Sequence, residues 1–269
     1  MIERIDSPAN KKVKLAAALK QRKQREKTGL FVAEGIRLCE MAADAGWQIE
    51  FGLLTSQILE QKRGAELVEK LTCQNCPLYE VPDNSFAKAA GTETPQGIML
   101  VMAQKNPSLP ARTERDKPLY VVMDGVQDPG NAGTIIRTAD AVGADGVILL
   151  KGTVDVYSDK AVRSTMGSIF HVPVYSGVTL DELTEFVQES GLQLLATALD
   201  ETAIRHYLGD YVSPCAIVFG NEGNGVSEQM LQDADQKVYI PMSGQAESLN
   251  VSAAVAILIY EAFRQRSIL

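Results

Sequence analysis

The sequence has few cysteines, two histidines and no long apolar segment. The longest apolar run near its C-terminus, VSAAVAILIY, is about half of what a membrane-spanning helix needs, and Glu261 ends it. The N-terminal stretch MIERIDSPANKK is charged and lacks the apolar core of an export signal. Four cysteines without such a signal fit reduced thiols in the cytoplasm. We therefore expect a cytoplasmic protein without a membrane segment.

The sequence also lacks the ligand spacing of a structural metal site. Cys73 and Cys76 form a CxxC pair, but no second pair follows at zinc-ribbon spacing, and His171 and His206 are distant in sequence. A structural zinc site needs four ligands. We therefore expect no metal.

The net charge of −8 argues against a nucleic-acid partner, but the charge is unevenly distributed. Residues 1–27 carry nine basic side chains against three acidic ones. A basic segment on an acidic body can bind phosphates, whereas the alternative is a solvated helix face. The basic residues are Arg4, Lys11, Lys12, Lys14, Lys20, Arg22, Lys23, Arg25 and Lys27.

A chain of 269 residues favours two domains. Helical and strand patterns alternate in residues 1–103, beginning with a helix predicted over 11–27 and ended by Gly29. Residues 104–118 contain three prolines and almost no large apolar groups, which indicates a linker. A second domain is predicted over 119–269.

The strands predicted in the second domain are apolar throughout. They read LYVVM, GVILL, LQLLATAL and CAIVFG, and helical patterns separate them. Strands of this kind are buried on both faces, as in a parallel sheet covered by helices. We predict an open, doubly wound α/β fold, whose ligands bind at the carboxyl ends of the strands.

Three segments of this domain each join an apolar strand to a helix: DGVQDPGNAGTIIRTADAVGA, IVFGNEGNGVS and IPMSGQAESLNVSAA. The glycine order in the second does not match a dinucleotide-binding turn, and Lys151 stands where an acidic ribose ligand would be required. No Lys-Ser/Thr pair follows the glycines, which disfavours a P-loop. A nicotinamide enzyme is therefore disfavoured.

The motifs NxGxxxRTA, FGNEGxG and IPMxGxxxSLNVSxA, in this order, resemble the SpoU/TrmH family of the SPOUT RNA methyltransferases. The intervening KAVRSTMGSIFHVPV also resembles the family's stretch between its first two motifs. The first domain, through SPANKKVKLAAALKQRKQREKTGLFVAEG, is similar to the small ribosomal-protein-like α/β/α substrate-binding domain often fused to these enzymes.

This resemblance implies a parallel sheet whose C-terminal segment is threaded into a deep trefoil knot. It also implies a homodimer that binds S-adenosylmethionine in the knot and methylates a ribose 2′-hydroxyl of RNA. The N-terminal domain favours 23S ribosomal RNA as the substrate. Transfer RNA is the alternative substrate, and a non-catalytic RNA-binding protein on the same fold is the alternative outside the enzymes.

The resemblance also implies a cofactor site. Backbone groups at Gly220, Ile240 and Leu249 match the positions that hold the adenine and ribose, with Thr197 and Ala198 beside them. We expect valine at Gly220 to block the cofactor while leaving the fold intact.

The family's functional polar positions match Arg137, Glu222, Ser248 and Asn250, and Asn131 lies in the first motif. Ser248 and Asn250 can bind the target ribose or cap the last helix. Glu222 can orient Arg137 or contact RNA, and its alternative is a solvated loop carboxylate.

The first motif suggests a tight turn between strand and helix. Gly130 and Gly133 are expected to form that turn, which Asn131 caps or holds. Arg137 is then expected on the first turns of the helix, near the ligand edge. There it can orient the target phosphate and stabilise developing alkoxide charge. The alternative for Arg137 is an ion pair with an aspartate, either Asp140 or Asp128.

The last predicted helix, 248–266, is apolar nearly all round between Val251 and Phe263. A helix on the surface of a monomer should show one polar face. We expect the knot to cover one side and a second subunit the other, with Ile259 facing outward.

Overall fold

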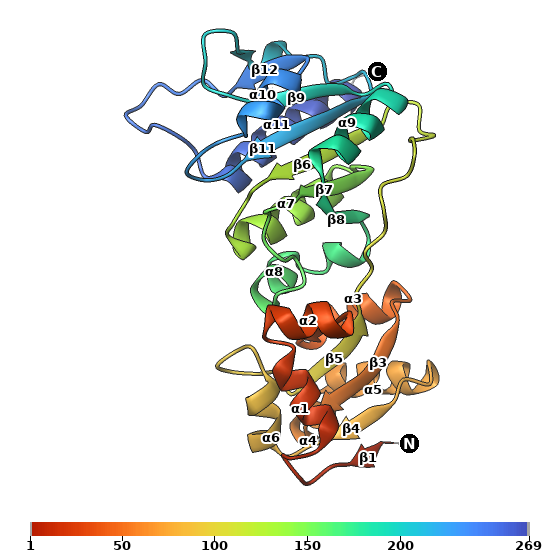
Figure 1. Cartoon of the computed structure of the whole chain (residues 1–269). Helices are drawn as coiled ribbons and strands as arrows, with labels where there is room; N and C mark the ends of the chain where they lie inside the picture. The colour runs from red at the N-terminus through yellow and green to blue at the C-terminus, as the bar shows by residue number, and fades with distance from the viewer. Residues whose placement is uncertain (1, 268–269) are drawn as a thin grey trace. The chain divides into compact units, whose positions relative to one another are not determined.

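The computed structural model describes residues 2–267, which form two compact units (Figure 1). The N-terminal unit comprises the chain up to Lys105 together with Asp155–His171. The C-terminal unit comprises Asn106–Val154 and the chain from Val172 onward. The segment Asp155–His171 therefore packs with the first unit, although it lies between two strands of the second.

The N-terminal unit is built on a five-stranded mixed sheet with the order β1-β4-β3-β5-β2. β4 pairs in parallel with β1 and β3, whereas β5 runs antiparallel to its neighbours β2 and β3. The strands are β1 (Glu3–Arg4), β2 (Leu30–Glu34), β3 (Ile49–Leu54), β4 (Leu78–Glu80) and β5 (Ile98–Ala103).

Helices flank this sheet. Buried residues of α1 and α6, such as Val13 and Phe86, pack against β2, β3 and β5. On α3, the contacts are with β2, β5 and α5. Gly29 ends α2 with φ 66°, as predicted. The helices are α1 (Lys11–Ala18), α2 (Arg22–Thr28), α3 (Ile36–Asp44), α4 (Ser56–Glu60), α5 (Lys62–Cys73), α6 (Asp83–Ala89) and α8 (Asp159–Ser164), with a 3-10 turn at Ser168–Phe170.

The single helix predicted over residues 11–27 is wrong, because the chain breaks between α1 and α2. Arg25 on α2 is buried, and its Nη1 donates to the carbonyl oxygens of Leu19 (2.7 Å) and Lys20 (2.9 Å). The break exposes these carbonyls, and the guanidinium satisfies them. The apolar periodicity alone did not indicate this bond.

The C-terminal unit contains a seven-stranded sheet with the order β10-β12-β9-β11-β6-β7-β8, and every pairing in it is parallel. The predicted α/β fold with a parallel sheet is confirmed. The strands are β6 (Leu119–Asp124), β7 (Gly146–Leu150), β8 (Val174–Val178), β9 (Gln193–Thr197), β10 (Ile204–Arg205), β11 (Cys215–Gly220) and β12 (Gln236–Tyr239).

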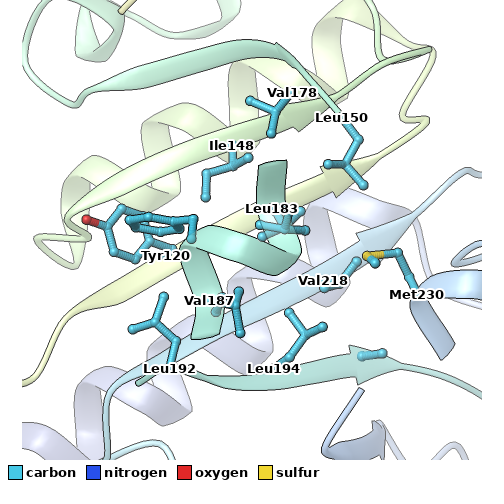
Figure 2. Packing of buried hydrophobic residues seen from close by; sticks show 14 of the residues in the cluster. Tyr120, Ile148, Leu150, Val178, Leu183, Val187, Leu192, Leu194, Val218 and Met230 are labelled. Carbon is cyan, nitrogen blue, oxygen red and sulfur yellow. The ribbon is translucent and has the colours of Figure 1, made fainter. Parts of the chain in front are cut away.

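Helices cover this sheet as well. Figure 2 shows Leu183 and Val187 of α9 among side chains of the strands, including Ile148 and Val218, with Met230 of α10 in the same cluster. α7 and α11 lie outside that cluster, where α7 contacts β7 and α11 contacts both β11 and α7. The helices are α7 (Pro129–Ala141), α9 (Leu180–Glu189), α10 (Glu228–Asp233) and α11 (Val251–Ser267), with a 3-10 turn at His206–Leu208.

The last helix, α11, begins three residues later than predicted. Its buried face includes Leu258 and Ile259, so the outward position expected for Ile259 is wrong. The exposed large apolar side chains are instead Ile257 (37%), Tyr260 (49%) and Phe263 (44%), which recur at helical spacing. Within residues 2–267, no helix is long and apolar enough to cross a membrane.

Candidate functional site

The three motif loops meet at the carboxyl edge of the seven-stranded sheet through one side chain. Asn131 near the start of α7 donates from its Nδ2 to Glu222, which follows β11, over 2.9 Å. The Oδ1 of Asn131 accepts from Nδ2 of Asn250, which precedes α11, over 3.0 Å. The structure therefore brings together Asn131, Glu222 and Asn250, one residue from each motif.

The turn of the first motif lies earlier in the chain than predicted. Gly125 adopts φ 72°, and α7 already begins at Pro129, so Gly130 and Gly133 lie inside the helix. The helix cap is Asp128, whose Oδ1 accepts from the backbone N–H of Asn131 over 2.9 Å. Asn131 therefore does not cap the helix, and its side chain is available to Glu222.

Glu222 acts as an acceptor for the start of α7. Its carboxylate accepts from the backbone N–H of Gln127 (3.1 Å) and of Asp128 (3.3 Å), in addition to Asn131. Burial by itself would raise the pKa of Glu222, but these hydrogen bonds outweigh it, so the pKa lies below its ordinary value. Glu222 thus holds a negative charge at a helix N-terminus, where the helix dipole favours it.

Asn250 has two roles within the fold. Its Oδ1 accepts from the backbone N–H of Ser252 (2.9 Å), the second residue of α11, and from the Ser252 hydroxyl. This is the bonding of a helix cap. Because its Nδ2 binds Asn131, the same side chain ties the start of α11 to the start of α7.

Arg137 and Ser248 are not part of this cluster. Arg137 is exposed on α7, about 12 Å along the helix axis from Pro129. Neither its guanidinium nor the Ser248 hydroxyl forms a hydrogen bond or ion pair with any residue in the described part of the chain. The alternative in which Arg137 only pairs with an aspartate therefore lacks support.

The positions expected to hold the cofactor lie on three adjacent strands. Thr197 ends β9, Gly220 ends β11 and Ile240 follows β12, and the sheet order places β9 between the other two. The Thr197 hydroxyl donates to the carbonyl of Val218 over 3.1 Å. Because parallel strands end at one edge, these residues line the same rim of the sheet.

Ala198 and Leu249 complete this set of positions. The Ala198 N–H donates to the carbonyl of Val238 over 3.0 Å, which ties the loop after β9 to β12. Leu249 lies exposed in the third motif loop, just before the α11 cap.

The third motif loop leaves its hydrogen-bonding groups open. Among the described residues, the backbone of 241–249 forms no hydrogen bond within the protein. Leu249 and Leu199, which follows β9, expose apolar side chains. Backbone donors and acceptors beside apolar groups fit the adenine and ribose of S-adenosylmethionine, which need both.

Gly220 is constrained by the fold itself. A Cβ atom at this position would overlap the backbone of Gly225 and Val226, in the loop that folds back on the end of β11. The expectation that valine at Gly220 spares the fold is therefore wrong. Glycine is required here because two backbone segments approach closely.

One asparagine and one glutamine support the cluster, although the sequence interpretation did not single them out. Asn221 donates from Nδ2 to the carbonyl of Gly125 (2.8 Å), and Gln127 donates from Nε2 to the same carbonyl (3.1 Å). Asn221 also accepts from Gly223 over 2.8 Å. An asparagine beside glycines is typical of such a local turn. The FGNEG motif therefore contained a sequence signal for the role of Asn221.

Most of the basic residues at the N-terminus are already engaged. The Nζ of Lys12 lies 4.4 Å from the ring centroid of Tyr79, and Lys20 donates to the carbonyl of Lys88. Arg4, Arg22 and Arg25 pair with Asp6, Glu26 and Asp155, respectively. Of the lysines in residues 2–27, Lys11, Lys14, Lys23 and Lys27 are exposed and have no such partner in the described part of the chain.

Metal-ligating side chains do not gather anywhere in the described part of the chain. No group of three or more histidine, cysteine, aspartate or glutamate residues is placed to hold an ion there. The four cysteines are free thiols, of which Cys39 and Cys215 are buried.

Comparisons with known proteins match both units. The model of the SpoU rRNA methylase family matches residues 118–260, and that of the MRM3-like substrate-binding domain matches 10–100. The chain is 36% identical to the 23S rRNA (guanosine(2553)-2′-O)-methyltransferase RlmP of Bacillus subtilis, over 96% of this chain and 98% of RlmP. It is 32% identical to the 23S rRNA (uridine(2479)-2′-O)-methyltransferase of Streptomyces viridochromogenes, over 93% of this chain and 88% of that enzyme.

Solved structures of methyltransferases are similar to this chain over nearly its whole length. An AdoMet-bound rRNA methyltransferase from Sinorhizobium meliloti is similar with a TM-score of 0.89 and 32% identity, over 98% of each chain. The SpoU methyltransferase AviRb of Streptomyces viridochromogenes, in complex with AdoMet, has a TM-score of 0.86 and 29% identity, over 97% of this chain and all of AviRb.

Replacing Gly220 by alanine should destabilise the protein by about 1–3 kcal/mol or more, because the backbone around the new methyl group must shift. The urea midpoint measures this loss. Gly223→Ala is the matched control, since a Cβ there meets only Asn221 at an ordinary 3.5 Å. An unchanged midpoint for Gly220→Ala would show that the close approach is absent.

The Glu222 carboxylate should stabilise the fold in a pH-dependent way. Because its pKa is lower in the folded state, its contribution is present above pH 4.5 and is lost as the pH falls through the folded-state value. The difference in unfolding free energy between the wild type and Glu222→Gln should therefore shrink from pH 7 to pH 3. Glu185→Gln, on the exposed side of α9, is the control. A difference that does not change with pH would contradict the bonding described.

Proposed function

We infer that this chain, which belongs to the SpoU rRNA methylase family, is an S-adenosylmethionine-dependent RNA ribose 2′-O-methyltransferase acting on 23S ribosomal RNA. Relatives similar over nearly the whole chain are named 23S rRNA 2′-O-methyltransferases, and similar structures contain AdoMet. As a ribosomal RNA enzyme, it would work in the cytoplasm.

One observation carries the proposal. Asn131, Glu222 and Asn250 come from three motifs that are far apart in sequence, and they form one hydrogen-bonded cluster at the ligand edge of the parallel sheet. Turns that only reversed the chain would not need polar side chains bonded to one another across three loops. A shared site accounts for the arrangement.

We assign cofactor binding to the rim beside this cluster. Thr197, Ala198, Gly220, Ile240 and Leu249 border it, and the open backbone groups of the third motif loop would hold the adenosine part. When bound, S-adenosylmethionine supplies an electrophilic methyl group on a sulfonium. The reaction joins the ribose 2′-oxygen to that carbon, breaks the carbon–sulfur bond and releases the hydroxyl proton.

The protein's part in this transfer is positioning and charge stabilisation. Holding the hydroxyl in line with the methyl group can supply ~7–11 kcal/mol of the barrier. Ser248 and Asn250 are placed in the loop that would contact the ribose. Glu222 already accepts three N–H groups, so its role is to hold Asn131 and the start of α7 in place.

The guanidinium of Arg137 is suited to binding the RNA backbone. It stays protonated, so it does not serve as the base. Because no ion pair in the described residues occupies it, its planar fork is available to bind a phosphate and to stabilise the developing alkoxide.

The N-terminal domain, residues 1–103, would hold the RNA through its free lysines, with 104–118 as the linker to the catalytic domain, 119–269. Lys11, Lys14, Lys23 and Lys27 place positive charge on α1 and α2 within an otherwise acidic protein. Phosphate binding by such a segment needs no net positive charge on the chain.

The C-terminal segment would form the trefoil knot and the homodimer. The chain leaves β12 near one edge of the sheet and returns through residues 240–250 to pack α11 on α7, and this return supports the proposal of a threaded C-terminal segment. The exposed face of Ile257, Tyr260 and Phe263 would pack on a second copy, since such apolar patches mark protein interfaces.

Purified protein should transfer a labelled methyl group from S-adenosylmethionine to 23S rRNA, and Arg137→Ala should slow turnover by ~10²–10³. Cofactor affinity, measured by calorimetry, should not change. Arg137→Lys should retain partial activity, because it keeps the charge without the fork. Absence of ribose methylation by the wild type would refute the function, whereas normal turnover of Arg137→Ala would remove only that residue.

Replacing Lys11, Lys14, Lys23 and Lys27 by alanine should weaken RNA binding and reduce its salt dependence. Each lost phosphate contact should lower the log–log slope by roughly 0.7–0.9. The control is Lys12→Ala with Arg22→Ala, whose cationic groups are engaged within the unit. Equal losses in both variants would show that the free lysines are not the RNA contacts.

Glutamate at Ile257 or Phe263 should yield monomers in sedimentation experiments, because it places charge in the proposed subunit interface. Leu59→Glu, at an exposed leucine of α4, is the control and should leave the assembly unchanged. A wild-type monomer, or dimers in both α11 variants, would contradict this interface.

A further inference from the structure

The turn after β7, Gly152–Asp155, lies outside the three motifs but holds the first one. Thr153 is buried, and its hydroxyl accepts from the N–H of Gly125 (3.1 Å) and donates to the carbonyl of Met123 (2.9 Å). The N–H of Val154 donates to the carbonyl of Val126 over 2.9 Å. These bonds fasten the turn to the loop that precedes α7.

That loop carries the donors that Glu222 binds. The N–H groups of Gln127 and Asp128, next to Val126, donate to the Glu222 carboxylate, and Asn131 follows one turn later. The Gln127 side chain also donates to the carbonyl of Gly152. Thr153 therefore bonds to the loop whose amides bind Glu222, rather than to the three motif residues themselves.

We propose that Thr153 is a positioning residue for methyl transfer. Its hydroxyl holds the loop that precedes α7, and that loop supplies the amides that Glu222 binds. Loss of this hydroxyl therefore displaces those amides and the start of α7. The inference rests on the proposed function for its catalytic consequence only.

Steady-state kinetics on 23S rRNA test the role of Thr153. Thr153→Val removes the hydroxyl with little change in volume and should lower kcat about tenfold, within the range reported for coupled networks. The KM for RNA and the affinity for S-adenosylmethionine should stay within about twofold, and Thr153→Ser should restore kcat. Thr165→Val is the matched control, because this buried hydroxyl forms local bonds, to Val162 and Gly167. A normal kcat for Thr153→Val, or an equal loss in the control, would overturn the assignment.

Hydrogen exchange tests the same role without catalysis. Thr153→Val should lower the hydrogen-exchange protection of residues 124–131, whereas Thr165→Val should leave it unchanged. Equal protection in the wild type and Thr153→Val would refute the positioning role. This readout needs no turnover, so it distinguishes failure of the inference from failure of the proposed function.

Discussion

The side-chain amide of Asn131 is the interaction on which the arrangement of the site depends. An amide is both donor and acceptor, so a single asparagine binds the carboxylate of Glu222 and the amide of Asn250 at once. Neither aspartate nor a hydrophobic residue of the same size could make both bonds in these directions. The cluster also joins two helix termini, because Glu222 accepts from the start of α7 and Asn250 caps α11. The loops of the candidate site are thereby held by regular elements rather than by one another alone.

Much of the fold could be predicted from the sequence because buried parallel strands and amphipathic helices leave clear patterns. Glycine at the end of α2 and the apolar strands β6, β7, β9 and β11 belong to this class. β8, β10 and β12 could not be identified in this way, since β10 has two residues and the other two are partly exposed. The break before α2 depends on Arg25. Two partners of its side chain, Leu19 and Lys20, lie close in sequence, but the third, Asp155, lies far away in sequence.

The candidate site was less predictable because its bonds are long-range. The motif pattern identified Asn131, Glu222 and Asn250, but it suggested a capping role for Asn131 that Asp128 performs. The Asp-Pro pair at the start of α7 was the signal for that cap. For Gly220, the pattern suggested a ligand contact but did not show the fold's own requirement, which is that backbone atoms of its own loop leave no room for a side chain. A glycine of this kind cannot be interpreted without the neighbouring backbone.

The bond between Asn131 and Asn250 also has a consequence for synthesis. The two residues are separated by 119 positions, and the second lies only nineteen residues before the last one. Ribosomes add about 5–20 residues per second, so the first motif waits on the order of 6–24 s for its partner. During that interval the sheet around β6 and β7 can form, but the site cannot. Translation therefore separates formation of the fold's centre from completion of the site, and a chain truncated before α11 would carry most of the sheet without the arrangement that the three motifs share.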